Sequence, residues 1–372
     1  YSGCAQVWAC AFAASLGSGQ ADCGTADTFI FMVFRMMHEQ NNPVTKADGT
    51  AAARVAVIVP AYGVAHLLGE ALASLQAQTL QDWECVVVDD GAPDDVAAAV
   101  APYLDDARIT FLETGNGGVS AARNRAIAQT RAPLVTLLDG DDMLRPGYLA
   151  TMTAALEQDL DARLVTCNAR IFGAVPQERD CFTRKQGKGD GVSGTLADVL
   201  DRSFSVYIGS TFRRADFDAV GGFDTTMTHA EDFDFWVRLV LLGGHALYIN
   251  SVLCDYRVRS SSASASSLKM LKGNIRTFEK ALAALSPDAA EVAIAQDMIA
   301  KNSRQLRFEQ AIDRVIDGDS KAIRELRATR GPEQGKSWDL ALLMWRFLPA
   351  LAAPLLAHRR KVNARGAVRE NA

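Results

Sequence analysis

The stretch RVAVIVPAYG, residues 54–63, decides the fold of this chain. Its apolar run, Val55–Val59, is rich in β-branched residues and ends at Pro60, which is typical of a strand buried on both faces of a parallel sheet. The following segment, Ala65–Gln78, carries leucines at helical spacing. A buried strand followed at once by a helix is the first half of a βαβ unit.

The same alternation continues along the chain. Further strands are predicted at Glu84–Val88, Ile109–Leu112, Leu134–Leu138 and Arg163–Cys167, and further helices at Asp94–Leu104, Val119–Thr130 and Pro146–Gln158. This pattern predicts an α/β fold with a Rossmann-like, mostly parallel sheet and helices on both faces. Right-handed crossovers place the C-terminal ends of the strands on one side, where open α/β sheets bind ligands.

The second half of the chain is less regular. It contains a polar segment expected to form a loop, three predicted strands, one predicted helix, a Ser/Ala linker and then two or three amphipathic helices. In chain order these are Ala174–Gly194, the strand Ser205–Phe212, the helix Ala230–Leu242, the strands Ala246–Ile249 and Val252–Arg257, the linker Ser260–Ser267, and the helical segment Leu268–Ala328. The linker marks the end of the α/β domain.

The 372 residues therefore divide into three predicted parts. Residues 1–50 show no clear strand or helix pattern, and we expect an N-terminal segment that is disordered or an artefact of gene calling, with Met36 or Met37 as the start. Residues 51–260 form the α/β domain, and residues 261–372 form a C-terminal helical extension.

Composition excludes several classes of protein. With 44 acidic and 39 basic residues the net charge is −5, so we expect no nucleic acid partner. The hydrophobic share of 49% and the charged share of 22% are those of an ordinary globular chain and not of a disordered one. The seven cysteines include no CxxC pair, which argues against a zinc site or a redox motif.

The segment 338–357 is strongly apolar but contains Arg346, and a basic run follows it at residues 358–361. A central arginine disfavours a membrane-spanning helix. Two interpretations stay open. The segment is an amphipathic helix that lies on an anionic membrane surface through residues 338–361, or it is a helix packed against protein. We expect a cytoplasmic protein, and the first interpretation makes it peripheral on the cytoplasmic face of the membrane.

Two acidic clusters follow predicted strands. In the motif DGDD, residues 139–142, two carboxylates flank a glycine and can hold one Mg²⁺ or Mn²⁺ ion together with phosphate oxygens and water. In the motif DDG, residues 89–91, an acid can accept hydrogen bonds from a ribose or a base. Each cluster has a structural alternative, a polar turn in the first case and a helix cap in the second.

Two further motifs open predicted helices. The motif NGGVSAARN, residues 116–124, combines glycines that allow close backbone approach with a helix N-terminus that favours an anion, and it places Arg123 nearby. Glu231 and Asp232 open the helix at Ala230–Leu242, where an acid can act as a general base. The alternatives are a plain loop-to-helix junction and acids that only stabilise the helix dipole.

The order and spacing of seven blocks between Arg54 and Ser264 resemble the inverting family 2 glycosyltransferases of the GT-A fold. The blocks are VIVPAY (57–62), VVDDG (87–91), NGGVSAARN (116–124), LLDGDD (137–142), VGGFD (220–224), ED (231–232) and DYR (255–257). The resemblance implies a GT-A type fold and a nucleotide-diphospho-sugar donor.

The resemblance also implies a role for each matched residue. Asp232 would be the catalytic base with Glu231 beside it, and Asp139 and Asp141 would bind a divalent cation, Mn²⁺ or Mg²⁺. The residues expected to bind the nucleotide sugar are Pro60, Ala61, Tyr62, Asp89, Asp90, Gly118, Arg123, Asp139, Gly140 and Arg259.

The chain departs from the family pattern at three positions. Gly63 stands where Asn is common, and Ala92 stands where Ser is common. Arg259 replaces a His that often follows the Tyr-Arg pair; it cannot ligate a metal ion but can bind a diphosphate directly. We therefore expect at most two protein carboxylates around the cation.

The expected reaction moves one sugar from a nucleotide-diphospho-sugar, most simply a UDP-sugar, to a hydroxyl of a glycan or lipid-linked acceptor in polysaccharide biosynthesis. One alternative is a nucleotidyltransferase of similar fold, although Pro60–Leu68 lacks the required Gly-rich and Lys signature. Another is a catalytically silent sugar-nucleotide-binding or scaffold protein, although Asp139, Asp141 and Asp232 are all present.

Overall fold

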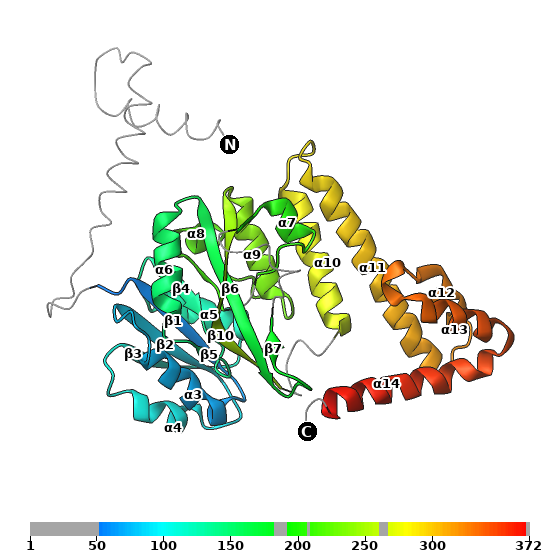
Figure 1. Cartoon of the computed structure of the whole chain (residues 1–372), viewed down its shortest axis with the longest axis horizontal. Helices are drawn as coiled ribbons and strands as arrows, with labels where there is room; N and C mark the ends of the chain where they lie inside the picture. Colours follow the sequence, from blue (N-terminus) through cyan, green and yellow to red (C-terminus); the bar gives the residue numbers. More distant parts are fainter. Residues whose placement is uncertain (1–51, 182–191, 207–208, 260–266, 370–372) are drawn as a thin grey trace, which may run out of the picture. The chain divides into compact units, whose positions relative to one another are not determined.

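The structure, a computed structural model, describes residues 52–181, 192–206, 209–259 and 267–369, with side chains to residue 360 (Figure 1). The predicted N-terminal segment, residues 1–50, lies outside them. The described strands are β1 Val55–Ala61, β2 Trp83–Asp90, β3 Ile109–Thr114, β4 Leu134–Leu137, β5 Met143–Leu144, β6 Ala162–Gly173, β7 Arg179–Asp180, β8 Val192–Gly194, β9 Thr211–Arg213 and β10 His245–Val258.

Helices surround and follow this sheet. They are α3 Ala65–Gln76, α4 Val96–Val100, α5 Val119–Ala128, α6 Tyr148–Gln158, α7 Leu196–Leu200, α8 Arg214–Ala219, α9 Glu231–Leu241, α10 Ser267–Ala284, α11 Glu291–Ile316, α12 Ala322–Thr329, α13 Lys336–Phe347 and α14 Ala352–Arg369. Helices lie on both faces of the sheet in Figure 1, which confirms the predicted α/β architecture.

The described strands form one sheet with the order β3-β2-β1-β4-β9-β6-β10-β5, in which β7 pairs with β6 and β8 pairs with β10. The strands β1 to β4 are mutually parallel, as their apolar runs predicted. Further along, β9 is antiparallel to both β4 and β6, whereas β6 and β10 are parallel. The ends of β1, β2 and β4 therefore lie at one edge, where the acidic motifs follow them.

The less regular half differs from the prediction in several places. The strands predicted at Ala246–Ile249 and Val252–Arg257 are one strand, β10, whose register shifts between Ile249 and Val252. A bulge of this kind bends a strand without ending it, but it interrupts the apolar pattern. The segment Ala174–Gly194 contains β7 and β8, while residues 182–191 lie outside the described part. In the segment Ser205–Phe212 only the end belongs to β9, and residues 207–208 lie outside the described part.

Two apolar cores lie on the two faces of the sheet. One contains side chains of α3, α4 and α6, and the other contains side chains of α5, α7 and α9. Trp236 of α9 is buried in the second core, as expected for an aromatic residue on an apolar helix face. Phe278 and Ala281 of α10 belong to this same core. The first helix of the C-terminal region is therefore packed as part of the α/β domain.

The segment predicted as one amphipathic helix, 338–357, is instead two helices separated by a short 3₁₀ turn at Pro349–Leu351. A proline disfavours the helical conformation of the residue before it, and Leu348 accordingly has φ −130° and ψ 64°. In the described part of the chain, no helix has the length and apolar content needed to cross a membrane.

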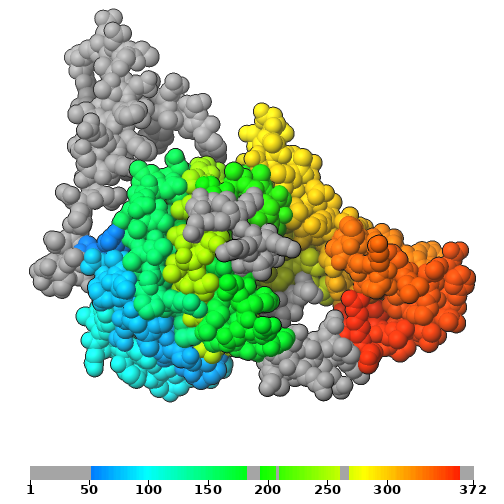
Figure 2. Space-filling view, in the orientation of Figure 1, coloured from blue at the N-terminus to red at the C-terminus, as the bar shows by residue number. Residues whose placement is uncertain are grey.

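The two faces of α13 and α14 differ. Trp338, Leu342, Trp345 and Leu356 are buried in a third core with α11 and α12. Other apolar side chains are exposed, and we call them the apolar patch: Leu340, Leu343, Phe347, Leu348, Leu351 and Leu355. Figure 2 shows this end of the chain in orange and red. The interpretation of a helix packed against protein therefore holds only for the buried face of the segment.

Candidate active site

Arg123, in the first turns of α5, joins two of the acidic motifs. Its side chain is 3% exposed, and it donates over 3.1 Å to Asp139 Oδ1 and over 3.1 Å to Glu231 Oε1. Burial alone would lower the pKa of Arg123, but the neighbouring carboxylates, that of Asp139 most strongly, raise it. One buried cation thus connects the loop after β4 with the first turn of α9.

The acidic loop, residues 139–142, is held in a fixed shape. Asp142 is buried, and its Oδ1 accepts a hydrogen bond from the Arg257 amide over 2.8 Å. A Cβ at Gly140 would lie 3.0 Å from Val64 and 3.3 Å from the carbonyl oxygen of Pro60. The glycine therefore lets the loop pack against the end of β1. Asp142 serves the structure of the loop, and Asp139 and Asp141 remain partly exposed.

Arg259 follows β10 and reaches the acidic loop. Its Nε lies 2.5 Å from Asp141 Oδ2, and its Nη1 donates to the Gly63 carbonyl over 3.4 Å. Burial and the charge of Asp139 raise the pKa of Asp141, and Arg259 opposes them in part. Arg259 therefore connects the ends of β1, β4 and β10 at the predicted donor site.

The turn after β1 contains the predicted Pro60, Ala61 and Tyr62. The amide groups of Gly63 and Ala65 donate to Asp94 over 2.9 Å and 2.6 Å, so this acid fixes the turn. Gly63 has φ 68°, a conformation that favours glycine. The side chain of Tyr62 is 54% exposed at the tip of this turn. Its ring is accessible to a ligand.

Asp89 and Asp90 have different surroundings. Asp90 is buried, and its two oxygens accept hydrogen bonds from the amides of Gly117 and Gly118 over 2.9 Å and 2.8 Å. It therefore shapes the glycine loop before α5, in which Gly118 has φ 82°. Asp89 is half-buried, and its Oδ1 accepts from the Ala92 amide over 2.7 Å. Asp89 is the accessible member of the pair.

Glu231 and Asp232 form the start of α9. The preceding residue, Ala230, has φ 57°, which is uncommon for a residue other than glycine. Burial raises the pKa of Glu231, and the ion pair with Arg123 opposes this shift. Asp232 accepts a hydrogen bond from the Phe233 amide over 2.7 Å. Because Glu231 is bound to Arg123, Asp232 is the better candidate for a base.

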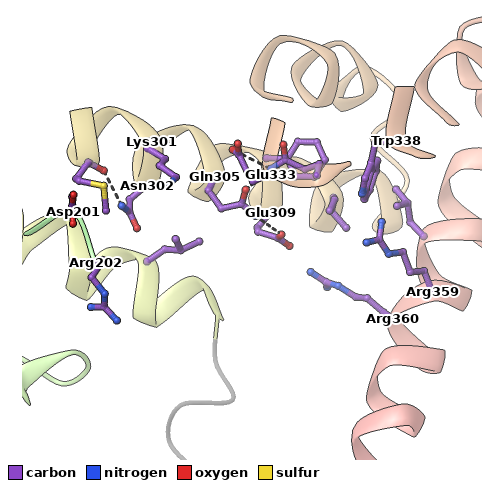
Figure 3. Close-up of a pocket in the computed structure, with 16 residues that line it drawn as sticks. Asp201, Arg202, Lys301, Asn302, Gln305, Glu309, Glu333, Trp338, Arg359 and Arg360 are labelled. Atoms are coloured by element: carbon purple, nitrogen blue, oxygen red, sulfur yellow. Dashed lines mark hydrogen bonds between the residues drawn. The ribbon is translucent and has the colours of Figure 1, made fainter. Parts of the chain in front are cut away.

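The sequence patterns did not identify Arg202. Its guanidinium carbon lies 4.3 Å from the ring centroid of Phe233, the residue after Asp232. It also lines one end of a cavity of about 520 Å³ whose other walls include C-terminal helices (Figure 3). Arg202 follows the short helix α7, and no motif or periodic pattern surrounds it, so no signal in the sequence could have found it.

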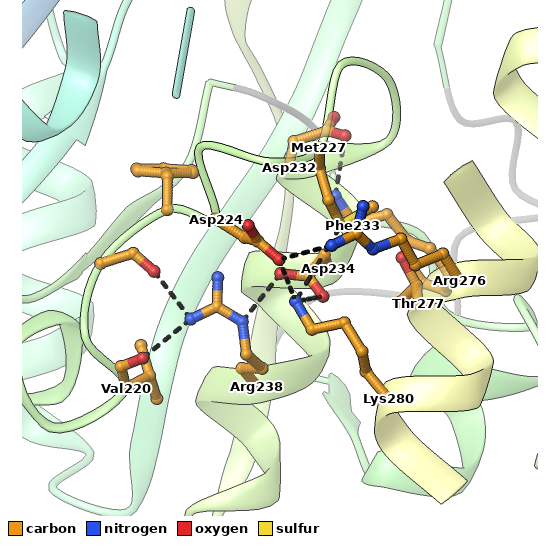
Figure 4. A network of polar contacts seen from close by, with 12 residues as sticks. Val220, Asp224, Met227, Asp232, Phe233, Asp234, Arg238, Arg276, Thr277 and Lys280 are labelled. Atoms are coloured by element: carbon orange, nitrogen blue, oxygen red, sulfur yellow. Dashed lines mark hydrogen bonds and ion pairs between the residues drawn. The ribbon is translucent and has the colours of Figure 1, made fainter. Parts of the chain in front are cut away.

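A buried ion-pair network attaches α10 to α9 (Figure 4). Asp234, which is 1% exposed, lies 2.5 Å from Lys280 of α10 and 2.8 Å from Arg238. Lys280 also lies 2.9 Å from Asp224. A lysine on the extension thus pairs with the helix that begins with Glu231 and Asp232.

Comparisons with known proteins show the family of this chain. The model for glycosyl transferase family 2 matches residues 56–220. Succinoglycan biosynthesis protein ExoU of Rhizobium meliloti (strain 1021) is 28% identical over 339 residues, 83% of this chain and 90% of that protein. The uncharacterized glycosyltransferase EpsJ of Bacillus subtilis (strain 168) is 38% identical over 106 residues, 28% of this chain and 31% of that protein.

A third relative, WfgD of Escherichia coli, is named UDP-Glc:alpha-D-GlcNAc-diphosphoundecaprenol beta-1,3-glucosyltransferase. It is 24% identical over 225 residues, 59% of this chain and 82% of that protein. This chain thus covers 31% of EpsJ, 82% of WfgD and 90% of ExoU.

Two solved structures share the fold. TarS 1–349 of S. aureus in complex with UDP-GlcNAc has a TM-score of 0.56 at 19% identity, over 86% of this chain and 90% of that chain. Mannosyltransferase PcManGT of Pyrobaculum calidifontis in complex with GDP-Man and Mn²⁺ has a TM-score of 0.55 at 19% identity, over 93% and 96%. They confirm the GT-A fold. The family match spans helix α5, which carries Arg123, and the acidic loop, and the chain belongs to glycosyltransferase family 2.

Proposed function

We propose that this glycosyltransferase inverts the anomeric centre and moves one sugar from a UDP-sugar to a hydroxyl acceptor. The bridge from Arg123 to Asp139 and Glu231 carries the proposal, because it joins the donor-side loop to the helix start that bears Asp232. The donor class is supported by the complexes of TarS with UDP-GlcNAc and PcManGT with GDP-Man, and by the UDP-Glc donor in the name of WfgD.

Asp232 acts as the base. Its carboxylate takes the proton of the acceptor hydroxyl while that oxygen attacks the anomeric carbon from the side opposite the leaving group. The new C–O bond forms as the bond from the anomeric carbon to the diphosphate oxygen breaks, and its electron pair leaves with the nucleoside diphosphate. A single displacement inverts the centre and needs no glycosyl-enzyme intermediate.

Charge that develops on the leaving diphosphate must be offset. Arg259 lies beside the acidic loop, and the amide groups at the start of α5 follow the glycine loop that Asp90 shapes. A guanidinium can bind a diphosphate through two parallel hydrogen bonds, and a helix N-terminus favours an anion. Both groups suit the donor diphosphate.

Asp139 and Asp141 fit the divalent cation that the family implies. Both are hard oxygen ligands on one loop, and burial together with the Asp139 charge raises the pKa of Asp141, a repulsion that a cation would relieve. Among the described residues, no group of three or more His, Cys, Asp or Glu side chains is placed to hold a metal. Phosphate oxygens and water would therefore complete the shell, and the bound cation would offset charge on the leaving group.

The enzyme assay measures release of nucleoside diphosphate from UDP-, GDP- and TDP-sugars in the presence of Mn²⁺. We expect release by the wild type with at least one donor, and strong losses for Asp232→Asn and Asp141→Ala. Asp105→Asn, an exposed acid of the same domain, is the matched control and should keep wild-type activity. No release with any donor and no Mn²⁺-dependent nucleotide binding would contradict the proposal.

We also propose that the apolar patch lies against an anionic membrane, which makes the enzyme peripheral on the cytoplasmic face and suits a lipid-linked acceptor. A cleft of about 300 Å³ beside the patch is lined by Arg327, Arg330 and Arg346 and by Asp339, which pairs with Arg330, and Leu343 belongs to both the cleft and the patch. Apolar side chains next to basic ones are typical of helices that bind anionic lipid surfaces.

Sedimentation with lipid vesicles tests this surface. The wild type should sediment with vesicles that contain phosphatidylglycerol and less with phosphatidylcholine alone. Phe347→Glu should reduce the bound fraction, because it places a charge in the patch. Leu160→Glu changes an equally exposed leucine of the α/β domain and should have no effect. Equal sedimentation of the wild type and Phe347→Glu would rule out the patch.

A further inference from the structure

The cavity of about 520 Å³ lies between the segment after α7 and the helices α10, α11, α13 and α14 (Figure 3). Arg202 lines one end, and Trp338, Arg359 and Arg360 line the other. Its volume is in the range of cavities that hold small organic ligands, roughly 300–1,000 Å³. None of the residues assigned to the donor lines it.

One end of the cavity lies beside the proposed base. Arg202 stacks on Phe233, the neighbour of Asp232, and Asp232 contributes to the electrostatic surroundings of the Arg202 guanidinium. Arg202 has φ 66°, an uncommon conformation for this residue type, of the kind that is concentrated at functional sites. A molecule bound against Arg202 would therefore have one end close to Asp232.

The charges in the cavity favour an anion. Within the described part of the chain, Arg202, Lys301 and Arg359 form no ion pair, although Arg202 and Arg359 stack on aromatic rings. Of the acids in the lining, Glu333 pairs with Arg304, Asp201 accepts from the Ser203 amide, and Glu309 accepts from Gln305 and is acted on by the charges of Arg360 and Arg359. Arg202 and Lys301 are thus the cations that remain to be matched by a ligand.

The helices at the far end also carry the apolar patch. Trp338 of α13 and Leu356 of α14 line the cavity, while Leu343 and Leu355 of the same helices are exposed in the patch. A ligand with an anionic centre and an apolar chain could therefore bind with its charge at the Arg202 end of the cavity and its chain against Trp338 and Leu356. Guanidinium groups are well suited to phosphate oxygens.

We propose that this cavity binds the diphosphate of an acceptor whose sugar is attached, through that diphosphate, to an apolar chain. This inference rests on the proposed glycosyl transfer, for which it supplies the acceptor class. The diphosphate would lie at the end of the cavity that Arg202 and Lys301 line, and the acceptor hydroxyl would lie beyond Arg202, toward Asp232.

Calorimetric titration of the full chain with farnesyl diphosphate tests the site. A saturating nucleoside diphosphate is kept in solution so that the donor site is filled. We expect binding by the wild type and about a tenfold higher Kd for Lys301→Glu, which corresponds to about 1.4 kcal/mol. Arg202→Asn should also weaken binding, since asparagine tolerates a left-handed backbone. The matched control is Arg307→Ala on α11, an exposed residue that does not line the cavity, and its Kd should not change.

Two further probes identify the part of the ligand that is recognised. Farnesol, which has the chain without the charge, should bind much more weakly than farnesyl diphosphate. Inorganic pyrophosphate should also bind more weakly, since it lacks the chain. Pyrophosphate that binds as tightly as farnesyl diphosphate would overturn the lipid-linked acceptor, because the cavity would then recognise a free anion.

The outcomes separate this inference from the proposed function. A wild-type chain that binds no nucleoside diphosphate contradicts the proposed function itself. A chain that binds nucleotide, but has the same Kd for farnesyl diphosphate in the wild type, Lys301→Glu and Arg202→Asn, contradicts the cavity alone. Thermal unfolding of each variant confirms that it is folded before its Kd is compared.

Discussion

Gly273 of α10 lies directly against the backbone carbonyl of His229. A Cβ at position 273 would lie 2.3 Å from the His229 oxygen and 3.0 Å from the Ala230 Cβ. His229 and Ala230 lead into Glu231 and Asp232 at the start of α9. The backbone that presents the proposed base is therefore in close contact with a helix of the C-terminal region.

Gly273→Ala should lower kcat and stability together. The added methyl group cannot fit without moving the His229 backbone, and such overpacking costs about 1–3 kcal/mol. Nucleoside diphosphate release and urea denaturation measure the two effects. Gly69→Ala in α3 is the control, because its Cβ would meet only the Tyr103 hydroxyl, at 3.2 Å. A fully active and stable Gly273→Ala would show that this contact does not position the base.

Lys280→Met should be strongly destabilising. The change leaves Asp234, which is almost fully buried, without one of its two cations, and the loss of one partner of a buried ion pair costs about 3–5 kcal/mol. Urea denaturation gives the difference in free energy of unfolding. Lys321→Met changes an exposed lysine of the C-terminal region and should have little effect. Similar stabilities of the two variants would count against the network of Figure 4.

Acid should weaken the pairing of Lys280 with Asp224. Burial acts to raise the pKa of Asp224, but hydrogen bonds from Thr226 and Lys280 bring it below the ordinary value of 3.8. The Asp224 carboxyl therefore binds a proton more readily in the unfolded chain than in the folded one. The stabilisation by ionised Asp224 is complete above its ordinary pKa and is lost as the pH falls through its lowered pKa in the folded chain. The stability advantage of the wild type over Asp224→Asn should be constant from about pH 7 to 5 and shrink below about pH 4. A stability advantage of the wild type that grows as the pH falls would contradict the expected direction of the pH dependence.

Asp232→Asn and Glu231→Gln should have different kinetic effects. Loss of a general base lowers kcat by about 10²–10⁴-fold, so Asp232→Asn should act on kcat with little change in the donor KM. Glu231→Gln weakens the contact with Arg123 and should raise the donor KM with a smaller loss of kcat. Steady-state kinetics with one donor separates the two. Near-normal kcat for Asp232→Asn would place the base elsewhere.

Arg259→His should strengthen Mn²⁺ binding in the absence of nucleotide. The change removes the guanidinium that pairs with Asp141 and supplies an imidazole, a common metal ligand, at the same place. Mn²⁺ titration followed by electron paramagnetic resonance measures the affinity. Arg259→Lys keeps the charge without adding a ligand and should resemble the wild type. Equal affinities for all three chains would show that position 259 does not contribute to the cation site.

The parallel half of the fold could be predicted because its rules are local. Val55–Val59 and the strands after it are buried on both faces, so each is a short apolar run that a helix pattern follows at once. Strand β10 could not be predicted as a single strand, since the bulge between Ile249 and Val252 interrupts the apolar pattern. The break at Pro349 was visible as a proline, but the apolar content of 338–357 suggested a continuous helix.

The candidate site was predictable where its residues belong to motifs. Asp139, Asp141, Glu231 and Arg123 lie in the blocks that resemble the family, and the structure brings them together. Long-range pairings were not predictable. Lys280 meets Asp234 and Arg202 meets Phe233 only because distant segments fold onto α9. The sequence around a single lysine or arginine does not indicate which distant residue its side chain contacts.

The attachment of α10 to α9 also bears on chimaeras in which related enzymes exchange their C-terminal regions. An exchange of the whole C-terminal region would replace Gly273 and Lys280 together with the cavity, and so would disturb the catalytic helix while altering recognition. A junction placed after Ala284 would retain α10 and exchange only α11–α14. Modular recombination in this lineage is therefore expected to favour crossovers after α10, where specificity can change while the catalytic machinery is inherited intact.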